Sequence, residues 1–334
     1  MADISIIGTG TWGIALSILL NQNGHRVCAW SALQEEITYL REHGIHKSLP
    51  GVSIPGEIQW VDTDCLGEAC EGKDLLILAV PSIFARETCR KMKPFVRKGQ
   101  VIVNVAKGIE EGTLMTLTDQ ILEEIPWADA AVLSGPSHAE EVARGIPTTC
   151  VVGASTRETA EMIQNCFMSP VFRVYTSPDV LGIELGGALK NVIALAAGVA
   201  DGLGYGDNTK AALITRGIAE ISRLGIAMGG RKETFSGLSG IGDLIVTCAS
   251  MHSRNRRAGI FIGQGKTMEE AMKEVKMVVE GVYSAKAALA LGERYHVDLP
   301  IISQVNQVLF EGKSAKDAVM DLMLRDKNME VAWE

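Results

Sequence analysis

Hydrophobic residues follow different patterns in the two halves of the 334-residue chain. In the first half, short continuous apolar runs, typical of strands buried on both faces, alternate with segments whose apolar residues recur at helical spacing. The expected strands are residues 3–8, 25–30, 74–80, 100–108, 130–136, 148–154 and 172–176. Because strands that alternate with helices form parallel sheets through right-handed crossovers, we predict a doubly wound α/β sheet here.

The second half has helical periodicity throughout, with breaks rich in glycine and aspartate. The expected helices are residues 180–204, 208–229, 253–265, 267–275, 282–296, 301–312 and 314–324. The strand pattern of the first half does not recur here with comparable clarity. We therefore predict a mostly parallel, doubly wound domain at residues 1–182, followed by an all-helical domain at residues 183–334.

Composition and charge narrow the range of partners. The formal charge of −8 argues against nucleic acid or an anionic membrane as the main partner. Uninterrupted apolar runs stay below the roughly 20 residues of a membrane span, and the acidic N-terminus differs from a secretory signal. Seven cysteines without a CxxC pair indicate reduced thiols and a cytoplasmic location. The six histidines form no metal-ligand pattern, so no metal site is expected.

The motif GTGTWG places Gly8, Gly10 and Gly13 between the first expected strand and the helix that follows. In this context GxGxxG is typical of a Rossmann-like turn that binds the diphosphate of a dinucleotide at a helix N-terminus. An acid at the end of the second strand would favour NAD, and an arginine there would favour NADP. Glu35 and Glu36 come later, and we expect them on a solvated helix face. The sequence therefore predicts NAD or NADP without resolving the preference.

Two lysines stand out by their positions. Lys107 follows the strand in NVAKG, at the edge of the sheet where ligands bind in open α/β folds. Lys190 lies in LGGALKNVIALAAG, a run of small and aliphatic residues with no other charge. A lysine in such a helix either extends to water or is kept inside for chemistry. Small residues on both sides favour the second interpretation.

Eight blocks occur in order along the chain: GTGTWG, AVPS, NVAKGIE, LSGPSHAEE, LGGALKNVIALAAG, GLSGIGDLIVTC, SRNRR and VVEG. Together they resemble bacterial NAD(P)-dependent glycerol-3-phosphate dehydrogenase, from residue 3 to about residue 325. The resemblance implies reduction of dihydroxyacetone phosphate to sn-glycerol 3-phosphate for phospholipid synthesis, and a homodimer formed through the helical half. One departure is that WSAL lacks the basic residue that many family members have after this tryptophan.

The resemblance also implies roles for single residues. Lys190 would be the general acid/base, and Lys107 and Arg254 would contact both cofactor and substrate. The other implied substrate contacts are Gly135, Ser137, Asp243, Ser253 and Asn255. The other implied cofactor contacts are Thr11, Trp12, Ala139, Val278 and Glu280.

Residue chemistry agrees with these roles. Reduction of a ketone needs a proton donor, and burial near a second ammonium such as Lys107 lowers the pKa of a lysine toward neutrality. Asn191 follows Lys190 and is expected to bind the substrate or steady that lysine. Asp243 is either a helix N-cap or a functional residue, which would accept a hydrogen bond from a substrate hydroxyl or pair with Lys190.

The segment HSRNRR is the best candidate for a phosphate site, because Ser253 can cap a helix there and Arg254 can add charge. We expect Arg256 and Arg257 to be solvated or paired elsewhere.

Two other functions are compatible with the sequence. A nucleotide-sugar dehydrogenase would use Cys248 as nucleophile, and a sensor would bind the nucleotide without turnover.

Overall fold

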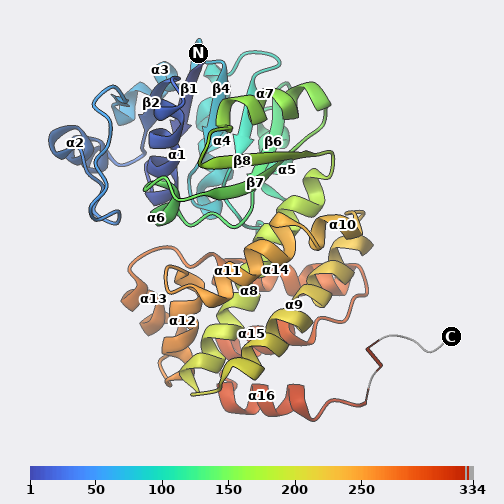
Figure 1. Cartoon of the computed structure of the whole chain (residues 1–334). Helices are drawn as coiled ribbons and strands as arrows, with labels where there is room; N and C mark the ends of the chain where they lie inside the picture. Colours follow the sequence, from blue (N-terminus) through green and yellow to red (C-terminus); the bar gives the residue numbers. More distant parts are fainter. Residues whose placement is uncertain (328, 331–334) are drawn as a thin grey trace.

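The computed structural model describes residues 1–327, 329 and 330, and its first half is built on one eight-stranded sheet (Figure 1). The strand order is β3-β2-β1-β4-β5-β6-β7-β8, and neighbours are parallel except β6 and β7. The strands are β1 Asp3–Ile7, β2 Arg26–Trp30, β3 Gln59–Val61, β4 Leu75–Leu78, β5 Val101–Asn104, β6 Asp129–Ser134, β7 Thr148–Ala154 and β8 Phe172–Ser177. The predicted doubly wound, mostly parallel sheet is confirmed.

The helices of this half cover both faces of the sheet. They are α1 Thr11–Gln22, α2 Gln34–His43, α3 Leu66–Cys70, α4 Ala85–Met92, α5 Leu117–Glu124, α6 Ala139–Val142 and α7 Arg157–Phe167. Neighbouring residues of β1 belong to different cores: Ile6 packs in the layer with α1, and Ile7 packs in the layer with α3 and α4. Successive side chains of a strand point to opposite faces of the sheet, and both faces are covered by helices here. This strand is therefore apolar at nearly every position.

Two sequence expectations differ from the sheet as it forms. Strand β3 was not predicted, because three residues at the sheet edge, Gln59–Val61, give no apolar run. Strand β5 ends at Asn104 rather than at residue 108. Lys107 therefore lies in a loop beyond the strand, where its backbone is not fixed by the sheet.

The second half is a bundle of helices below the sheet (Figure 1). Its helices are α8 Val180–Gly202, α9 Asp207–Ala227, α10 Lys232–Phe235, α11 Asp243–Ala249, α12 Arg254–Gly263, α13 Met268–Val275, α14 Glu280–Arg294, α15 Pro300–Phe310 and α16 Ala315–Met323. The described residues after Ser177 contain no strand, so the helical character predicted from the sequence is confirmed.

Helix α8 is the centre of this bundle, and its small residues allow other helices to approach closely. A Cβ on Gly198 would lie 2.1 Å from the carbonyl oxygen of Arg256, and one on Gly259 would lie 2.2 Å from that of Leu195. The helix corresponds to the one expected at residues 180–204 and ends two residues earlier. By length and composition it is able to cross a membrane, yet 83% of its apolar window is buried inside the protein. It is thus a core helix, which holds Lys190 inside the fold.

Candidate active site

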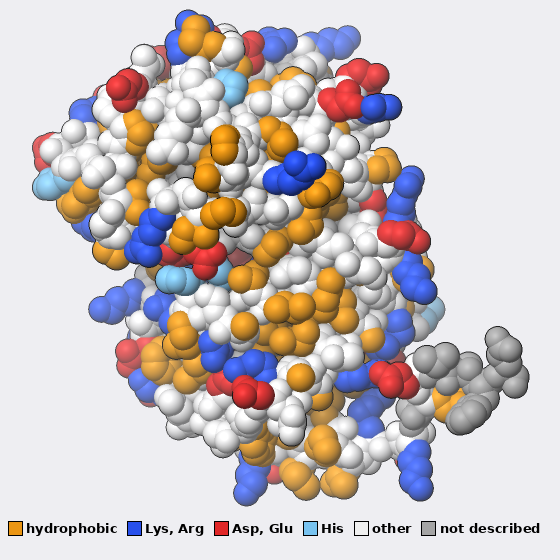
Figure 2. All heavy atoms as spheres, in the orientation of Figure 1, with side chains coloured by type: hydrophobic (Ala, Val, Ile, Leu, Met, Phe, Trp, Pro, Cys, Tyr) orange, Lys and Arg blue, Asp and Glu red, His pale blue; other side chains and the backbone are white. Residues whose placement is uncertain are grey.

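A cavity of about 360 Å³ lies where the carboxyl ends of β1, β4, β5 and β6 face α8, α11, α12 and α14. The order of the sheet reverses between β1 and β4, the point where open α/β sheets bind ligands. In Figure 2, histidines and charged side chains gather at the boundary between the two halves. The predicted residues that line the cavity are Gly10, Thr11, Trp12, Lys107, Ser137, Ala139, Lys190, Asn191, Ser253, Arg254, Asn255, Val278 and Glu280.

The turn between β1 and α1 has the shape that a dinucleotide diphosphate requires. Gly8 has φ +119°, and a Cβ on it would lie 2.8 Å from the backbone of Ala79. A Cβ on Gly13 would lie 2.0 Å from the carbonyl oxygen of Gly8, so helix and turn touch. Gly10 instead faces open space, and no side chain caps α1 there. The free first turn of the helix therefore fits the diphosphate of NAD(P).

Lys190 ends in a buried cluster of three charges. Its side chain is 7% exposed, and Nζ donates to Asp243 Oδ1 at 2.5 Å and to Thr247 Oγ1 at 2.6 Å. Lys107 Nζ donates to the other carboxylate oxygen of Asp243 at 2.5 Å and to the carbonyl of Gly135 at 3.1 Å. One carboxylate thus holds two ammonium groups at the cavity wall. Extension of Lys190 to water is excluded by its burial.

The pKa values in this cluster follow from burial and charge. Burial lowers the pKa of Lys190 to about 7; Asp243 opposes this change, and the ammonium of Lys107 adds to it. Burial would raise the pKa of Asp243, but the two lysines hold it below its usual value. A lysine that gains and loses its proton near neutral pH is suited to general acid–base catalysis.

Glycine makes room for this arrangement. A Cβ on Gly187, one turn before Lys190 on α8, would lie 3.0 Å from Ser134 Oγ and 3.4 Å from the Lys107 side chain. The stem of Lys107 therefore passes directly over the helix at a position without a side chain. Gly187 of LGGALK thus leaves room for Lys107 to approach Lys190.

Asp243 does not cap its helix, so the N-cap interpretation is wrong. The N-cap of α11 is Gly242, no side chain caps the helix there, and Asp243 is its first residue. Thr247 comes one turn later, donates to the carbonyl of Asp243 at 2.6 Å and accepts from Lys190. Sequence reasoning missed Thr247, although the spacing of four from Asp243 on an expected helix would have placed both on one face.

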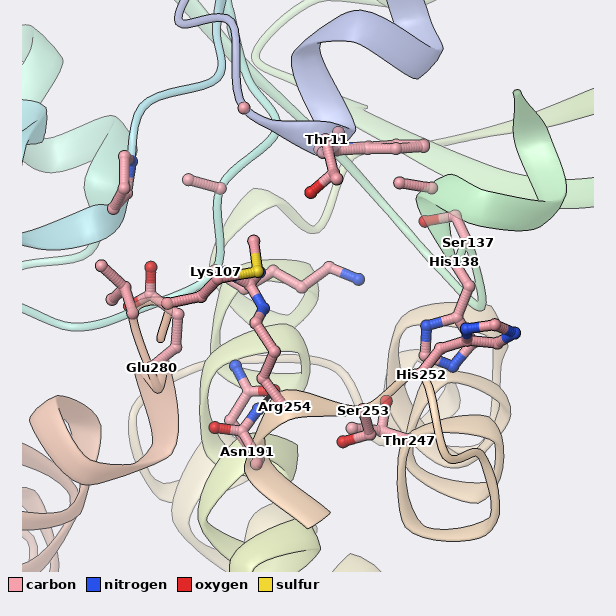
Figure 3. A pocket seen from close by; sticks show the side chains of 18 of the residues that line it. Thr11, Lys107, Ser137, His138, Asn191, Thr247, His252, Ser253, Arg254 and Glu280 are labelled. Carbon is pink, nitrogen blue, oxygen red and sulfur yellow. Dashed lines mark hydrogen bonds between the residues drawn. The ribbon is translucent and has the colours of Figure 1, made fainter. Parts of the chain in front are cut away.

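The start of α12 lies across the cavity from Thr11 of the glycine-rich turn (Figure 3). Ser253 caps the helix, as expected, by accepting from the backbone N–H of Arg256 at 3.1 Å. Arg254 faces the cavity, while Arg256 is paired with Asp201 at 2.7 Å. Arg257 is half-buried and also lines the cavity, and its Nε is buried without a hydrogen-bond partner. Two guanidinium groups therefore face the same space.

A chain of amides joins three helices at the cavity floor. Asn255 Nδ2 donates to Asn191 Oδ1 at 2.9 Å, and the N–H of Gly281 donates to Asn255 Oδ1 at 2.8 Å. Glu280, next to Gly281, accepts from the backbone N–H of Ser82 at 3.0 Å and from its hydroxyl. Because Ser82 follows β4, this contact ties the helical half to the sheet half beside the cavity.

The sequence matches two family models along nearly its whole length. Residues 3–160 match the N-terminal model of NAD-dependent glycerol-3-phosphate dehydrogenase, and residues 179–320 match its C-terminal model. The chain belongs to this family.

Named relatives and a solved structure agree with this assignment. The chain is 64% identical to glycerol-3-phosphate dehydrogenase (NAD(P)+) of Agathobacter rectalis, over 99% of this chain and 98% of that protein. It is 61% identical to the enzyme of the same name from Fusobacterium nucleatum, over all of both chains. The crystal structure of glycerol-3-phosphate dehydrogenase from Coxiella burnetii superposes with a TM-score of 0.93 at 34% identity, over 97% of this chain and 99% of that one. The expected family and fold are therefore confirmed.

Four predicted site residues of this dehydrogenase lie behind the cavity wall. Gly8 and Gly13 shape the turn, the carbonyl of Gly135 holds Lys107, and Asp243 holds both lysines. They position the lining residues rather than face the cavity in this structure.

Two histidines that line the cavity were not predicted from the sequence. His138 of LSGPSHAEE and His252 before SRNRR have ring centroids 5.8 Å apart (Figure 3). Burial and the charge of Lys190 lower the pKa of His138, which favours its neutral form. The two histidines are far apart in the sequence and belong to no common motif, so only the three-dimensional structure shows that they form a pair.

Glu36 is not on a solvated helix face, contrary to expectation. Its Oε2 accepts from Thr9 Oγ1 and from Ser31 Oγ, each at 2.8 Å. Thr9 belongs to the glycine-rich turn and Ser31 follows β2. The carboxylate therefore points from α2 toward the glycine-rich turn and the end of β2. Glu35, one residue earlier, is exposed as expected.

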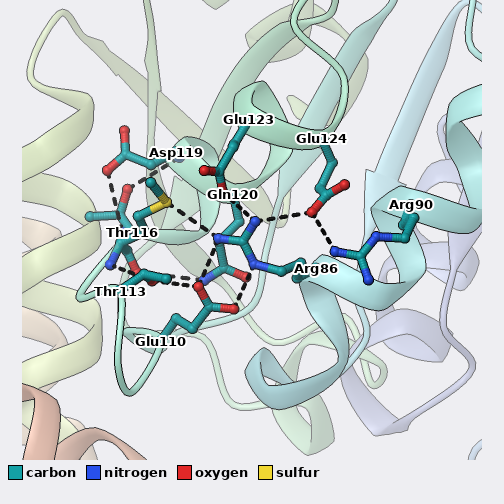
Figure 4. Close-up of polar contacts among 10 residues, drawn as sticks. Arg86, Arg90, Glu110, Thr113, Thr116, Asp119, Gln120, Glu123 and Glu124 are labelled. Carbon is teal, nitrogen blue, oxygen red and sulfur yellow. Dashed lines mark hydrogen bonds and ion pairs between the residues drawn. The ribbon is translucent and has the colours of Figure 1, made fainter.

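Buried polar groups fix the loop that carries Lys107. Asn104 accepts from the N–H of Ala106 at 3.0 Å and donates to Glu184 of α8 at 3.2 Å. Burial raises the pKa of Glu184 to about 7. Beyond the lysine, Glu110 accepts two hydrogen bonds from Arg86, both at 2.7 Å (Figure 4). Both ends of the loop are thus anchored by side chains.

The structure opposes Cys248 as a nucleophile. Its side chain is buried and does not line the cavity, and burial raises the pKa of the thiol to about 12. A thiol with so high a pKa is protonated at neutral pH, and nucleophilic attack needs the thiolate. The thiol-dependent mechanism is therefore not supported.

Proposed function

We propose that this protein catalyses reversible hydride transfer between NAD(P)H and dihydroxyacetone phosphate, giving sn-glycerol 3-phosphate. Membership of the glycerol-3-phosphate dehydrogenase family supports the reaction. The single observation that carries the mechanism is the buried Lys190–Asp243–Lys107 cluster at the wall of the cavity. The cofactor, when bound, supplies or accepts the hydride.

Lys190 acts as the general acid in reduction and as the base in oxidation. Reduction of a ketone leaves negative charge on its oxygen, and the ammonium of Lys190 gives that oxygen a proton. With its pKa lowered to about 7, Lys190 holds the proton weakly enough to release it at neutral pH. Asp243 and Thr247 fix the amine in place, and Lys107 orients the substrate beside it.

The remaining lining residues divide between substrate and cofactor. Asn191, Asn255 and Ser137 offer polar groups to the substrate hydroxyl and phosphate. Arg254, the N-terminus of α12 and Arg257 supply positive charge for the phosphate. The glycine-rich turn, Thr11 and Trp12 hold the dinucleotide at one end, and Ala139, Val278 and Glu280 line its place at the other.

The reaction is tested with the purified protein and dihydroxyacetone phosphate, followed by nicotinamide absorbance. We expect turnover with at least one reduced cofactor. In Arg254→Ala, KM for dihydroxyacetone phosphate rises at least about tenfold, because charge-assisted hydrogen bonds to the phosphate are lost. Arg256→Ala is the matched control, since Arg256 is on the same helix and pairs with Asp201 instead. Stoichiometric NADH binding without any turnover would favour the sensor function, and an unchanged KM in Arg254→Ala would contradict the phosphate role.

We propose that residues 1–182 and 183–334 form separate domains, which is supported by separate apolar cores in the sheet and helical halves. Residues 328 and 331–334 of the second domain lie outside the described residues. We also propose that the enzyme is cytoplasmic, in keeping with its free cysteines. Its product, sn-glycerol 3-phosphate, would be used in phospholipid synthesis.

We further propose a homodimer through the helical half. Exposed apolar side chains on this half, among them Met320, Met323 and Leu324, support an association surface. Light scattering during gel filtration is expected to give twice the chain mass of 35.8 kDa. A mass equal to that of one chain would contradict the dimer.

A further inference from the structure

We propose that Glu36 makes this enzyme select NADH over NADPH, by placing a carboxylate where the 2′-phosphate of NADPH would lie. The inference rests on the proposed function and goes beyond it, because the family name covers both cofactors. It depends on how the turn after β1, the end of β2 and the start of α2 meet.

The glycine-rich turn and the end of β2 are joined directly. The backbone N–H of Gly8 donates to the carbonyl oxygen of Trp30, the last residue of β2, at 2.8 Å. Glu36 reaches this junction from the first turn of α2 and accepts from Thr9 and Ser31. Both contacts use Oε2, so neither occupies Oε1. The carboxylate therefore bridges the diphosphate-binding turn and the strand end.

This junction is where a dinucleotide places its adenosine ribose. In doubly wound folds the diphosphate lies at the first turn, and the ribose beside it meets the end of the second strand. A carboxylate there accepts hydrogen bonds from the ribose 2′-hydroxyl of NADH. The same carboxylate repels a phosphate, because two negative charges in close contact weaken binding. Glu36 supplies this group from the helix instead of the strand end, which is why the strand-end residues did not reveal it.

Two basic side chains of this region have other partners. Arg41 donates to Asp62 at 2.8 Å and to the carbonyl of Trp60 at 3.2 Å. The ammonium of Lys47 lies 4.4 Å from the centre of the Tyr39 ring.

Other groups at the junction add no fixed positive charge for a 2′-phosphate. The residues that follow β2 are Ser31, Ala32 and Leu33, all uncharged. Burial lowers the pKa of His46, which favours its neutral form although Glu36 opposes the change. A 2′-phosphate would thus meet the Glu36 carboxylate without a fixed cation from these residues.

Equilibrium binding to the cofactor-free protein tests the proposal without relying on turnover. Fluorescence titration is expected to give a Kd for NADH at least about tenfold lower than for NADPH. In Glu36→Gln this ratio is expected to shrink at least about fivefold, chiefly through tighter NADPH binding, since the repulsion is removed. Glu35→Gln is the matched control, because Glu35 lies on the same helical turn but is exposed. Its ratio is expected to stay within about twofold of the wild-type value.

A second measurement on the wild-type protein keeps the test independent of how Glu36→Gln folds. 5′-AMP is expected to displace bound NADH at least about tenfold more effectively than adenosine 2′,5′-bisphosphate. Equal Kd values for NADH and NADPH, or equal displacement by the two nucleotides, would overturn the inference while leaving the dehydrogenase intact. Binding of neither dinucleotide would overturn both the inference and the proposed function.

Discussion

Replacement of Lys190 by alanine is expected to lower kcat for dihydroxyacetone phosphate reduction at least about 100-fold, the usual lower range for loss of a general acid. The physical reason is the position of the amine: it lines the cavity, is buried, and has a pKa lowered to about 7. Binding of NADH is expected to change little, because the glycine-rich turn that fits the diphosphate is on the other side of the cavity. The measurement is steady-state turnover together with NADH titration.

A matched control separates loss of the acid from loss of a charged helix residue. Lys210→Ala removes a half-buried lysine that pairs with Asp201 at 2.9 Å, outside the cavity lining. It is expected to retain turnover within about threefold of wild type. A small primary amine added to Lys190→Ala is expected to restore turnover at least about tenfold, because it can supply the missing proton. A loss below about tenfold in Lys190→Ala would contradict the catalytic role.

The sequence predicts the sheet and the position of Lys190 well because both are recorded in local patterns. Apolar runs mark buried parallel strands, and the GxGxxG spacing between a strand and a helix is itself a local signature. Gly13 is required by the nearby Gly8, whereas the close neighbour of Gly8 is the distant Ala79. A single lysine in an aliphatic helix stands out for the same reason. Lys190 is 5% exposed, since α8 is surrounded by other helices and its side chain ends at the wall of the cavity.

The rest of the site depends on contacts between segments that are far apart in the sequence. Thr247 and Asp243 meet Lys190 only because α11 packs against α8. Arg257 turns inward while Arg256 turns toward Asp201, a choice set by helix packing rather than by residue type. Glu36 looks like a surface residue by periodicity, and only its contacts with Thr9 and Ser31 show its place. Local patterns thus predict which elements form, and tertiary packing decides which side chains meet.

Replacement of Asp243 by asparagine is expected to have the second large effect, because it removes the only carboxylate that bridges Lys107 and Lys190 among their described contacts. Two buried ammonium groups would then face each other, and the pKa of Lys190 would fall further below 7. Reduction needs protonated Lys190. The kcat for reduction therefore falls as pH rises through the pKa of Lys190. In Asp243→Asn this decline is expected to move at least about one pH unit lower, which reduces turnover at pH 7 at least about fivefold.

Stability should change in a pH-dependent way that identifies the same cluster. The folded-state pKa of Lys190 lies below its unfolded value of 10.5, so the folded protein binds fewer protons and unfolding free energy rises with pH between about 7 and 10.5. Asp243→Asn extends this window downward, so its destabilisation, about 3 kcal/mol, should be greatest below the lowered pKa of Lys190 and should shrink as pH rises from there to about 7.

Denaturant unfolding and pH–rate profiles measured on the same variants test this coupling between stability and catalysis. Asp201→Asn is the matched control, because Asp201, which is half-buried, also bridges two cations, Arg256 and Lys210. It is expected to lower stability without moving the pH–rate profile, since neither cation is the proposed acid. If Asp243→Asn kept the wild-type profile, Asp243 would not set the proton affinity of Lys190. The buried carboxylate would then serve only to hold the two halves of the site together.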